Sequence, residues 1–218
     1  MRHNPPTLFF DDGTSITMQR KLGKGAFATV YLGPDGKAYA VVDESSHGTD
    51  YSKQILASIR REYKSRYLPA IEFLGHTEEE DYRSVYKMPV YVAPLRKKDH
   101  PKAYAQAKVL RDCLEEAHRN LSRRLKWNQR MTHYGHQLMD ETVECAKKNK
   151  LVPRGLVTAL ELLRDESANH GSDYTFEFPV RNLATTQSGH LILLDTVFSQ
   201  EAIEAKRKKE EAKRRRAW

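Results

Sequence analysis

The segment LGKGAFATVYLGPDGKAYAVV, residues 22–42, most constrains the fold, because two closely spaced glycines are followed directly by two strand-like runs. The turn Gly-Pro-Asp-Gly separates ATVYL from KAYAVV, which predicts a β-hairpin. Gly23 and Gly25 allow the backbone to approach an anion closely. A dinucleotide-binding loop is excluded, because that motif requires a helix after the glycines. Two interpretations remain, a loop that covers phosphate groups and a plain hairpin that contains glycines.

The remainder of residues 1–93 alternates strand-like runs with turn signals around one helical segment. TLFFDDGTSITMQ contains Asp-Gly between two strand-like runs, which predicts another hairpin. Residues 50–67 carry Ile55, Ile59 and Tyr63 at four-residue steps and predict an amphipathic helix. Residues 68–75 and the segment SVYKMPVYVAPL return to strand character.

From Pro101 the sequence becomes helical. Residues 102–129, 136–150 and 156–171 predict three helices, the last closed by Gly171. A loop, a strand, a QSGH turn and an apolar strand follow, and the apolar strand ends on Asp195. The pattern predicts an α+β protein with a β-rich part at 1–93, a helical part with a late hairpin at 94–199, and a basic tail at 200–218.

Three polar residues follow one another at spacings that are typical of a catalytic site. Glu177 lies five residues before Asn182, and a hydrophobic strand pair then leads to Asp195. Protein kinases place a catalytic acid five residues before an asparagine, and an aspartate that binds Mg²⁺ follows. Individually, Asn182 and Asp195 are also typical turn residues. Their order behind a glycine-rich loop favours the kinase interpretation.

A family resemblance rests on three segments: LGKGAFATVY, FEFPVRNLATTQSGHLILLDTVFSQ and a basic segment soon after Asp195. In these segments the chain resembles the early serine/threonine protein kinases of short-tailed lytic bacteriophages. The resemblance implies a two-lobed protein kinase-like fold with a minimal, mostly helical second lobe. It implies ATP and Mg²⁺ as cofactors, Glu177, Asn182 and Asp195 as catalytic residues, and Asn182 and Asp195 as metal ligands. The expected nucleotide-binding residues are Gly23, Lys24, Gly25, Ala26, Phe27, Val30, Ala40 and Met88.

Two departures from the kinase pattern leave activity open. The lysine that kinases carry on the third strand is replaced by Val42, and the usual catalytic aspartate is replaced by Glu177. Lys24, Lys37 and Lys53 are candidate substitutes, although each is also readable as a solvated surface lysine. Glu62, the natural glutamate partner on the helix, is expected to be a surface residue without that lysine.

Charge and cysteine content suggest a compartment and partners. The formal net charge of +8 favours acidic partners, and eight Lys or Arg lie between Lys206 and Arg216. This run is expected either to be a solvated helix or to contact nucleic acid or an acidic protein. The two cysteines indicate a reducing compartment, and the sequence shows neither a signal peptide nor a membrane-spanning run. We therefore expect a protein of the host bacterial cytoplasm.

Three hypotheses follow. The chain is an atypical protein kinase that modifies host proteins during infection. Alternatively, it is a catalytically inactive pseudokinase that binds and inhibits a host protein. As a third possibility, it is a basic protein that associates with nucleic acid or the transcription machinery, through 206–216 and the basic helical stretch at 119–130.

Overall fold

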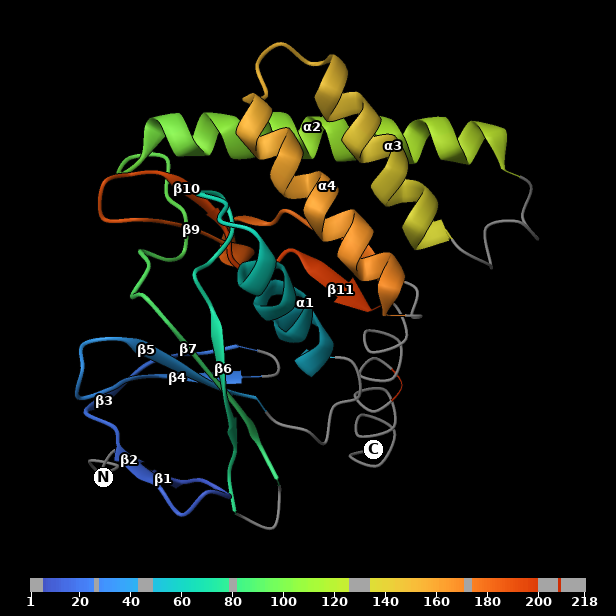
Figure 1. The fold of residues 1–218 in the computed structure, drawn as a ribbon. Helices are drawn as coiled ribbons and strands as arrows, with labels where there is room; N and C mark the ends of the chain where they lie inside the picture. Colours follow the sequence, from blue (N-terminus) through green and yellow to red (C-terminus); the bar gives the residue numbers. More distant parts are fainter. Residues whose placement is uncertain are drawn as a thin grey trace, which may run out of the picture.

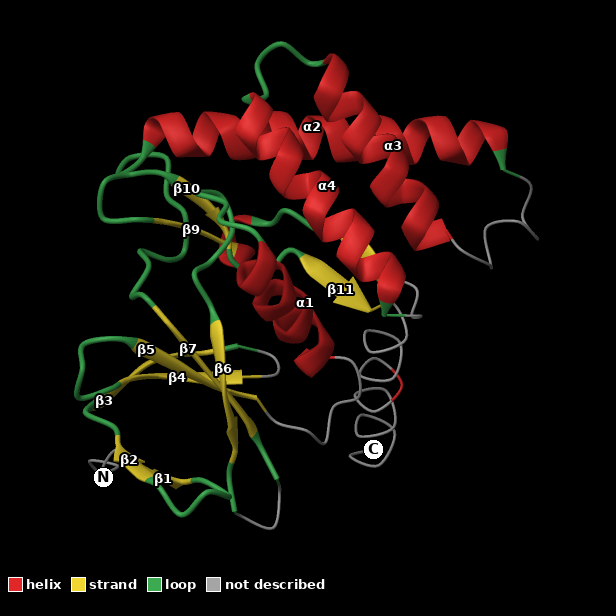
Figure 2. Ribbon diagram, viewed as in Figure 1, coloured by secondary structure: helices red, strands yellow, loops and turns green. Residues whose placement is uncertain are grey.

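The computed structural model describes residues 6–25, 28–42, 49–78, 82–125, 134–170, 174–199 and 208 (Figures 1 and 2). Ala26, Phe27 and the basic tail apart from Lys208 lie outside the described residues. Figure 1 shows the strands of the first part on one side and the three longest helices on the other, with helix α1 between them. This arrangement confirms the predicted α+β class, with a β-rich amino-terminal part and a helical carboxy-terminal part.

A five-stranded antiparallel sheet forms the first part, in the order β3-β4-β5-β7-β6. A separate two-stranded hairpin, β1-β2, precedes it and confirms the predicted Asp-Gly turn, where Gly13 has a φ of 78°. The strand bounds are β1 Thr7–Phe9, β2 Ser15–Thr17, β3 Arg20–Lys24, β4 Ala28–Leu32, β5 Ala38–Val42, β6 Glu72–His76 and β7 Ser84–Met88.

The central strand β5 separates two apolar clusters. Because successive side chains point to opposite faces of a strand, alternate residues of AYAVV enter different clusters. Ala38, Ala40 and Val42 join the larger cluster, which extends into the helical part. Tyr39 and Val41 join a smaller cluster under the β1-β2 hairpin.

Helix α1 (Thr49–Glu62) connects the sheet to the rest of the molecule, and it contacts β6, β11 and α4. Ile55 and Ile59 are buried as predicted, because their spacing places them on the same helix face. Tyr63, predicted to continue that face, is 52% exposed. The prediction for Tyr63 was wrong because the helix ends at Glu62 and the chain then turns away.

The strands after α1 are shorter than the sequence indicates. Leu68 and Ile71 are buried but precede β6, which begins at Glu72. Beyond Met88, the predicted strand PVYVAPL forms only an isolated bridge between Val92 and Thr185. The chain reaches the helices through this segment, where Pro removes backbone donors that a sheet would need.

Three helices form the second part, as predicted: α2 Pro101–Arg124, α3 Tyr134–Lys148 and α4 Arg154–Asn169. Pro101 begins α2 at a position where its missing N–H costs nothing. The buried face of α2 repeats every three to four residues: Ala103, Ala107, Leu110, Cys113, Ala117 and Leu121. In Figure 2 the three helices pack together above α1. Within the described residues no helix combines the length and apolar character needed to cross a membrane.

Two small hairpin-like sheets complete the second part. The predicted QSGH turn joins β9 (Leu183–Thr185) to β10 (Leu191–Leu193), and Gly189 takes a φ of 82° there. The pairing of β8 (Tyr174–Phe176) with β11 (Val197–Ser199) was not predicted. A single 3-10 turn at Val180–Asn182 precedes β9.

Candidate functional site

Glu177 follows strand β8 between two buried aromatic residues. Phe176 and Phe178 are 2% and 1% exposed, and their ring centroids lie 5.6 Å apart. The alternation of an extended chain therefore leaves the Glu177 side chain, which is 40% exposed, outside the core. Its backbone N–H donates to the carbonyl of Thr196 at 2.9 Å, which fixes this segment beside the residue that follows Asp195.

Asn182 and Asp195 are adjacent along their backbones although twelve residues separate them in the chain. Pro179 leads into the 3-10 turn that ends on Asn182, and strands β9 and β10 then return the chain. The backbone N–H of Asp195 donates to the carbonyl of Asn182 at 3.1 Å. The two-stranded pairing thus holds the backbones of Asn182 and Asp195 next to each other, and both residues are partly exposed.

Lys53 of α1 joins this group from the first part of the molecule. Its Nζ lies 3.9 Å from Oδ1 of Asp195, and its side chain is 11% exposed whereas that of Asp195 is 41% exposed. The sequence offered Lys53 as one of three substitutes for the missing strand lysine. A helix-face pattern would have singled it out, because Lys53 lies one turn before the buried residues Leu56 and Ala57.

Arg181 is a neighbour of the site that the sequence interpretation missed. Its Nη2 donates to Oε1 of Glu177 at 2.8 Å across the Pro179 turn. Both side chains are substantially exposed, at 71% for Arg181 and 40% for Glu177, so the pair contributes at most about 1 kcal/mol to stability. Its four-residue spacing from Glu177 was the available signal.

The glycine-rich segment lies at the end of strand β3, where Gly23 pairs with Val30 of β4 and Gly25 directly follows the strand. The Gly25 N–H donates to the carbonyl of Ala28 at 2.8 Å, and Gly23, Lys24 and Gly25 are all exposed. A methyl group added at Gly23 would meet no atom of the described residues within 4 Å. Packing within the described residues therefore does not require a glycine at 23.

Three predicted nucleotide-binding residues border the larger apolar cluster. Val30 pairs with Ala40 across strands β4 and β5 and is partly buried, and Ala40 itself is 0% exposed. Met88 pairs with Ala38 on the other side of β5 and is 7% exposed. These positions share one face of the sheet with Val42, which is also 0% exposed.

The other candidate cations and the helix glutamate lie on the surface. Lys24 and Lys37 are exposed, and Lys37 follows the turn at Gly36 rather than lying within β5. Glu62 is exposed at the end of α1, as expected.

The residues present fit a nucleotide with a divalent cation. Asn182 and Asp195 supply oxygen atoms, which Mg²⁺ prefers, and Lys53 supplies a cation beside them. Among described residues, no group of three or more His, Cys, Asp or Glu could hold a metal ion by itself. A magnesium ion at this position would therefore depend on phosphate oxygens for part of its coordination, as magnesium ions in nucleotide sites do.

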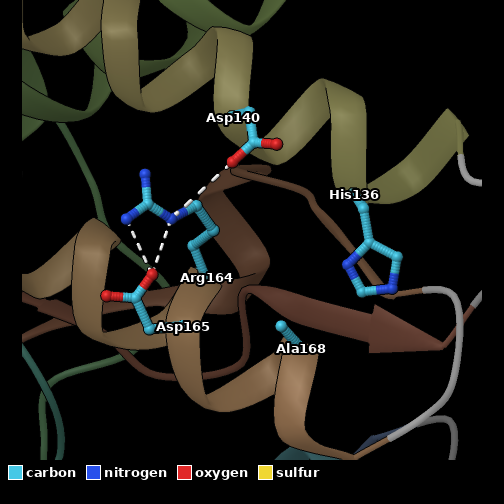
Figure 3. Close-up of a pocket in the computed structure, with 5 residues that line it drawn as sticks. All are labelled: His136, Asp140, Arg164, Asp165 and Ala168. Atoms are coloured by element: carbon cyan, nitrogen blue, oxygen red, sulfur yellow. Dashed lines mark hydrogen bonds and ion pairs between the residues drawn. The ribbon is translucent and has the colours of Figure 1, made fainter.

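A hollow of about 520 Å³ lies between α3 and α4, apart from the candidate site residues (Figure 3). Its lining residues are His136, Asp140, Arg164, Asp165 and Ala168. Arg164 is held by Asp165 at 2.7 Å and by Asp140 at 3.7 Å. None of these residues belongs to the predicted site.

Comparisons with known proteins give similarity to solved structures alone. No protein-family model matches the chain, and no curated protein matches it. Among solved structures, vaccinia related kinase 3 is similar over 89% of this chain, with a TM-score of 0.40 and 8% sequence identity. The chain spans about half the length of that structure, because the match covers 51% of it.

Proposed function

We propose that this chain is an atypical protein kinase that transfers a phosphoryl group from ATP to serine or threonine side chains of proteins. The observation that supports this proposal is the convergence of three separate segments. Lys53 from α1 and the Asn182 turn both lie against Asp195, and the Glu177 segment is hydrogen-bonded to the next residue. A cation, an amide, a carboxylate at a strand end and a second, accessible carboxylate are the parts that phosphoryl transfer uses.

The side chains divide into roles by their chemistry. The oxygens of Asn182 and Asp195 would hold Mg²⁺, which when bound neutralises the charge of the phosphate groups. Glu177 would accept or orient the proton of the substrate hydroxyl, a role that its exposure permits because a protein substrate must reach it from solvent. Phosphoryl transfer depends mainly on the positioning of the reactants and on electrostatic stabilisation. The charged and polar groups of these few residues are of the types that provide both.

Residues 23–25, at the end of β3, would lie over the phosphate groups. The space that the described residues leave beside the Gly23 backbone supports this role, because a glycine that their packing does not require leaves room for a ligand. The apolar positions Val30, Ala40 and Met88 would contact the nucleotide base.

The targets are proposed from the resemblance to phage kinases. They are host bacterial proteins, transcription machinery among them, modified in the host cytoplasm during infection. The basic run from Lys206 to Arg216 would favour acidic partners or nucleic acid through charge attraction.

Incubation of the purified chain with γ-labelled ATP, Mg²⁺ and a bacterial lysate tests the proposal. We expect labelled proteins that release phosphoserine or phosphothreonine on acid hydrolysis. Asp195→Ala should reduce labelling at least about hundredfold, because it removes a metal ligand. Asp112→Ala, a change of an exposed carboxylate on α2, serves as the control and should label normally. An absence of labelling by the unchanged chain would contradict the proposal.

A pseudokinase that binds and inhibits a host protein is the second candidate function. The observation that favours it is the complete burial of Val42 at the position where kinases carry their strand lysine. In that case Asp195→Ala would leave inhibition of the host unchanged, and a host protein would co-purify with both versions of the chain. Loss of the host effect with Asp195→Ala, in a folded variant, would contradict it.

A further inference from the structure

Lys53 is a charged residue in a largely buried position, and its burial requires an explanation. The residue is 9% exposed and lies on α1 among buried apolar residues, where a charged lysine is rarely found without a partner. The structure supplies that partner in Asp195, at the end of a distant strand. The pairing brings a buried cation to the edge of the candidate site rather than into the core.

The geometry of the pair leaves the ammonium group able to bind an anion. At 3.9 Å, the distance from Nζ to Oδ1 exceeds the 2.7–2.9 Å of a charge-assisted hydrogen bond. An ammonium carries three donors, so an attraction of this length leaves donors for a further oxygen. The carboxylate, more exposed than the lysine, likewise retains oxygen atoms for a metal ion.

Other lysines near the sheet are less suited to this role. Lys24 and Lys37 are exposed. Lys87, on β7, is engaged by Asp35 at 2.9 Å beside the Tyr39 ring, on the opposite face of the sheet from Val42. Lys53 is the lysine that the fold both buries and directs to Asp195.

The cation lies on a different element in this chain than in protein kinases. There a lysine on the third strand contacts the phosphates and pairs with a glutamate on the following helix. In this chain the strand position is the apolar, fully buried Val42, and the cation is on the helix.

We infer that Lys53 contacts the phosphate groups of the bound nucleotide, in place of a strand lysine, while Asp195 takes the metal ion. This inference rests on the proposed function, because it assigns a residue to the same site. It predicts that the contribution of Lys53 to affinity depends on how many phosphate groups the ligand carries.

A ligand series tests the inference. Dissociation constants for ATP, ADP, AMP and adenosine are measured by calorimetry with Mg²⁺, for the unchanged chain and for Lys53→Met. Lys64→Met, an exposed lysine just beyond α1, is the control. We expect Lys53→Met to weaken ATP binding by about tenfold to hundredfold, ADP binding by less, and adenosine binding by less than about twofold. Lys53→Arg should recover part of the ATP affinity, because it restores a cation.

The outcomes separate the two proposals. If the unchanged chain binds none of the four ligands, the proposed function fails and the inference with it. If it binds ATP and Lys53→Met binds ATP equally well, the inference alone fails. An equal loss for adenosine and ATP would also contradict it, because that pattern indicates a structural role for Lys53. Circular dichroism and urea unfolding establish whether Lys53→Met is folded. If Lys53→Met does not fold, Lys53→Gln, which is also neutral but has a different shape, is used in its place.

Discussion

Oε1 of Glu177 accepts a hydrogen bond from Nη2 of Arg181 at 2.8 Å, so the candidate base is held by a guanidinium from the other side of the Pro179 turn. The contact links two exposed side chains, and solvent screens it. The hydrogen bond therefore orients the Glu177 carboxylate and contributes little to the stability of the fold.

Replacement of either partner should separate these two effects. Arg181→Gln is expected to change the free energy of unfolding by less than about 1 kcal/mol. Glu177→Gln should leave stability equally unaffected yet reduce kcat for phosphoryl transfer by about hundredfold or more, because it removes the proton acceptor. Urea unfolding and steady-state kinetics provide the measurements. Full activity of Glu177→Gln would show that Glu177 is not the base.

Two glycines offer a matched pair for stability. A methyl group at Gly33 would collide with the ring of Tyr39, whereas one at Gly23 would meet no atom of the described residues within 4 Å. Gly33→Ala should therefore destabilise the protein by about 1–3 kcal/mol, since the Tyr39 ring must shift within a packed cluster. Gly23→Ala should change stability by less than about 1 kcal/mol. Thermal unfolding of both variants checks the prediction, and equal midpoints would contradict it.

The same Gly23→Ala variant also tests the end of β3 as a ligand contact. If the backbone at Gly23 approaches phosphate groups, the added methyl group should weaken ATP binding several-fold without a loss of stability. The dissociation constant for ATP is the quantity to measure. Unchanged affinity would remove Gly23 from the site and leave the other residues in place.

Helix α4 should contribute strongly to stability because it packs between α1 and α3. Leu160 is 0% exposed, so Leu160→Ala is expected to cost about 2–5 kcal/mol through lost burial and a residual cavity. Leu151 is 73% exposed, and Leu151→Ala should change the free energy of unfolding by no more than about 0.5 kcal/mol. Chemical denaturation of the two variants provides the comparison. Similar costs would indicate that α4 is not packed as described.

The two cysteines should react slowly in the folded protein. Burial raises the pKa of the Cys113 thiol, and burial together with the neighbouring Cys113 and Glu116 groups raises the pKa of the Cys145 thiol. A raised pKa lowers the fraction of reactive thiolate at a given pH, so reactivity should increase as the pH rises toward the shifted values. At pH 8 we expect alkylation by iodoacetamide to be at least about tenfold slower in buffer than in urea. Equal rates, followed by mass spectrometry, would contradict the burial of these groups.

The sequence predicted the helices and the tight turns because their signals are local. Proline at the start of α2, Asp-Gly turns and the QSGH turn each act over a few residues. The spacing of Glu177, Asn182 and Asp195 was also readable, and the structure places their segments together. The nucleotide-contact and catalytic roles assigned to these residues remain predictions.

What the sequence did not reveal depends on distant contacts. The pairing of β8 with β11 joins segments that the β9–β10 hairpin separates, and no local signal encodes it. Helical periodicity can place Lys53 on the buried face of α1, but its pairing with Asp195 depends on how α1 packs against β11, which only the folded chain determines. Tyr63 was misjudged because helical periodicity does not state where a helix ends.

Placing the cation on α1 has a mechanical consequence. Helix α1 touches β6 in the sheet and both α4 and β11 in the helical part, and the Lys53 side chain extends from it to Asp195. Because the ammonium already lies 3.9 Å from the carboxylate oxygen, a shift of α1 by a few ångströms would weaken this attraction without unfolding any element. A molecule that binds against α1 and displaces it would therefore alter the candidate site from a distance, without entering it.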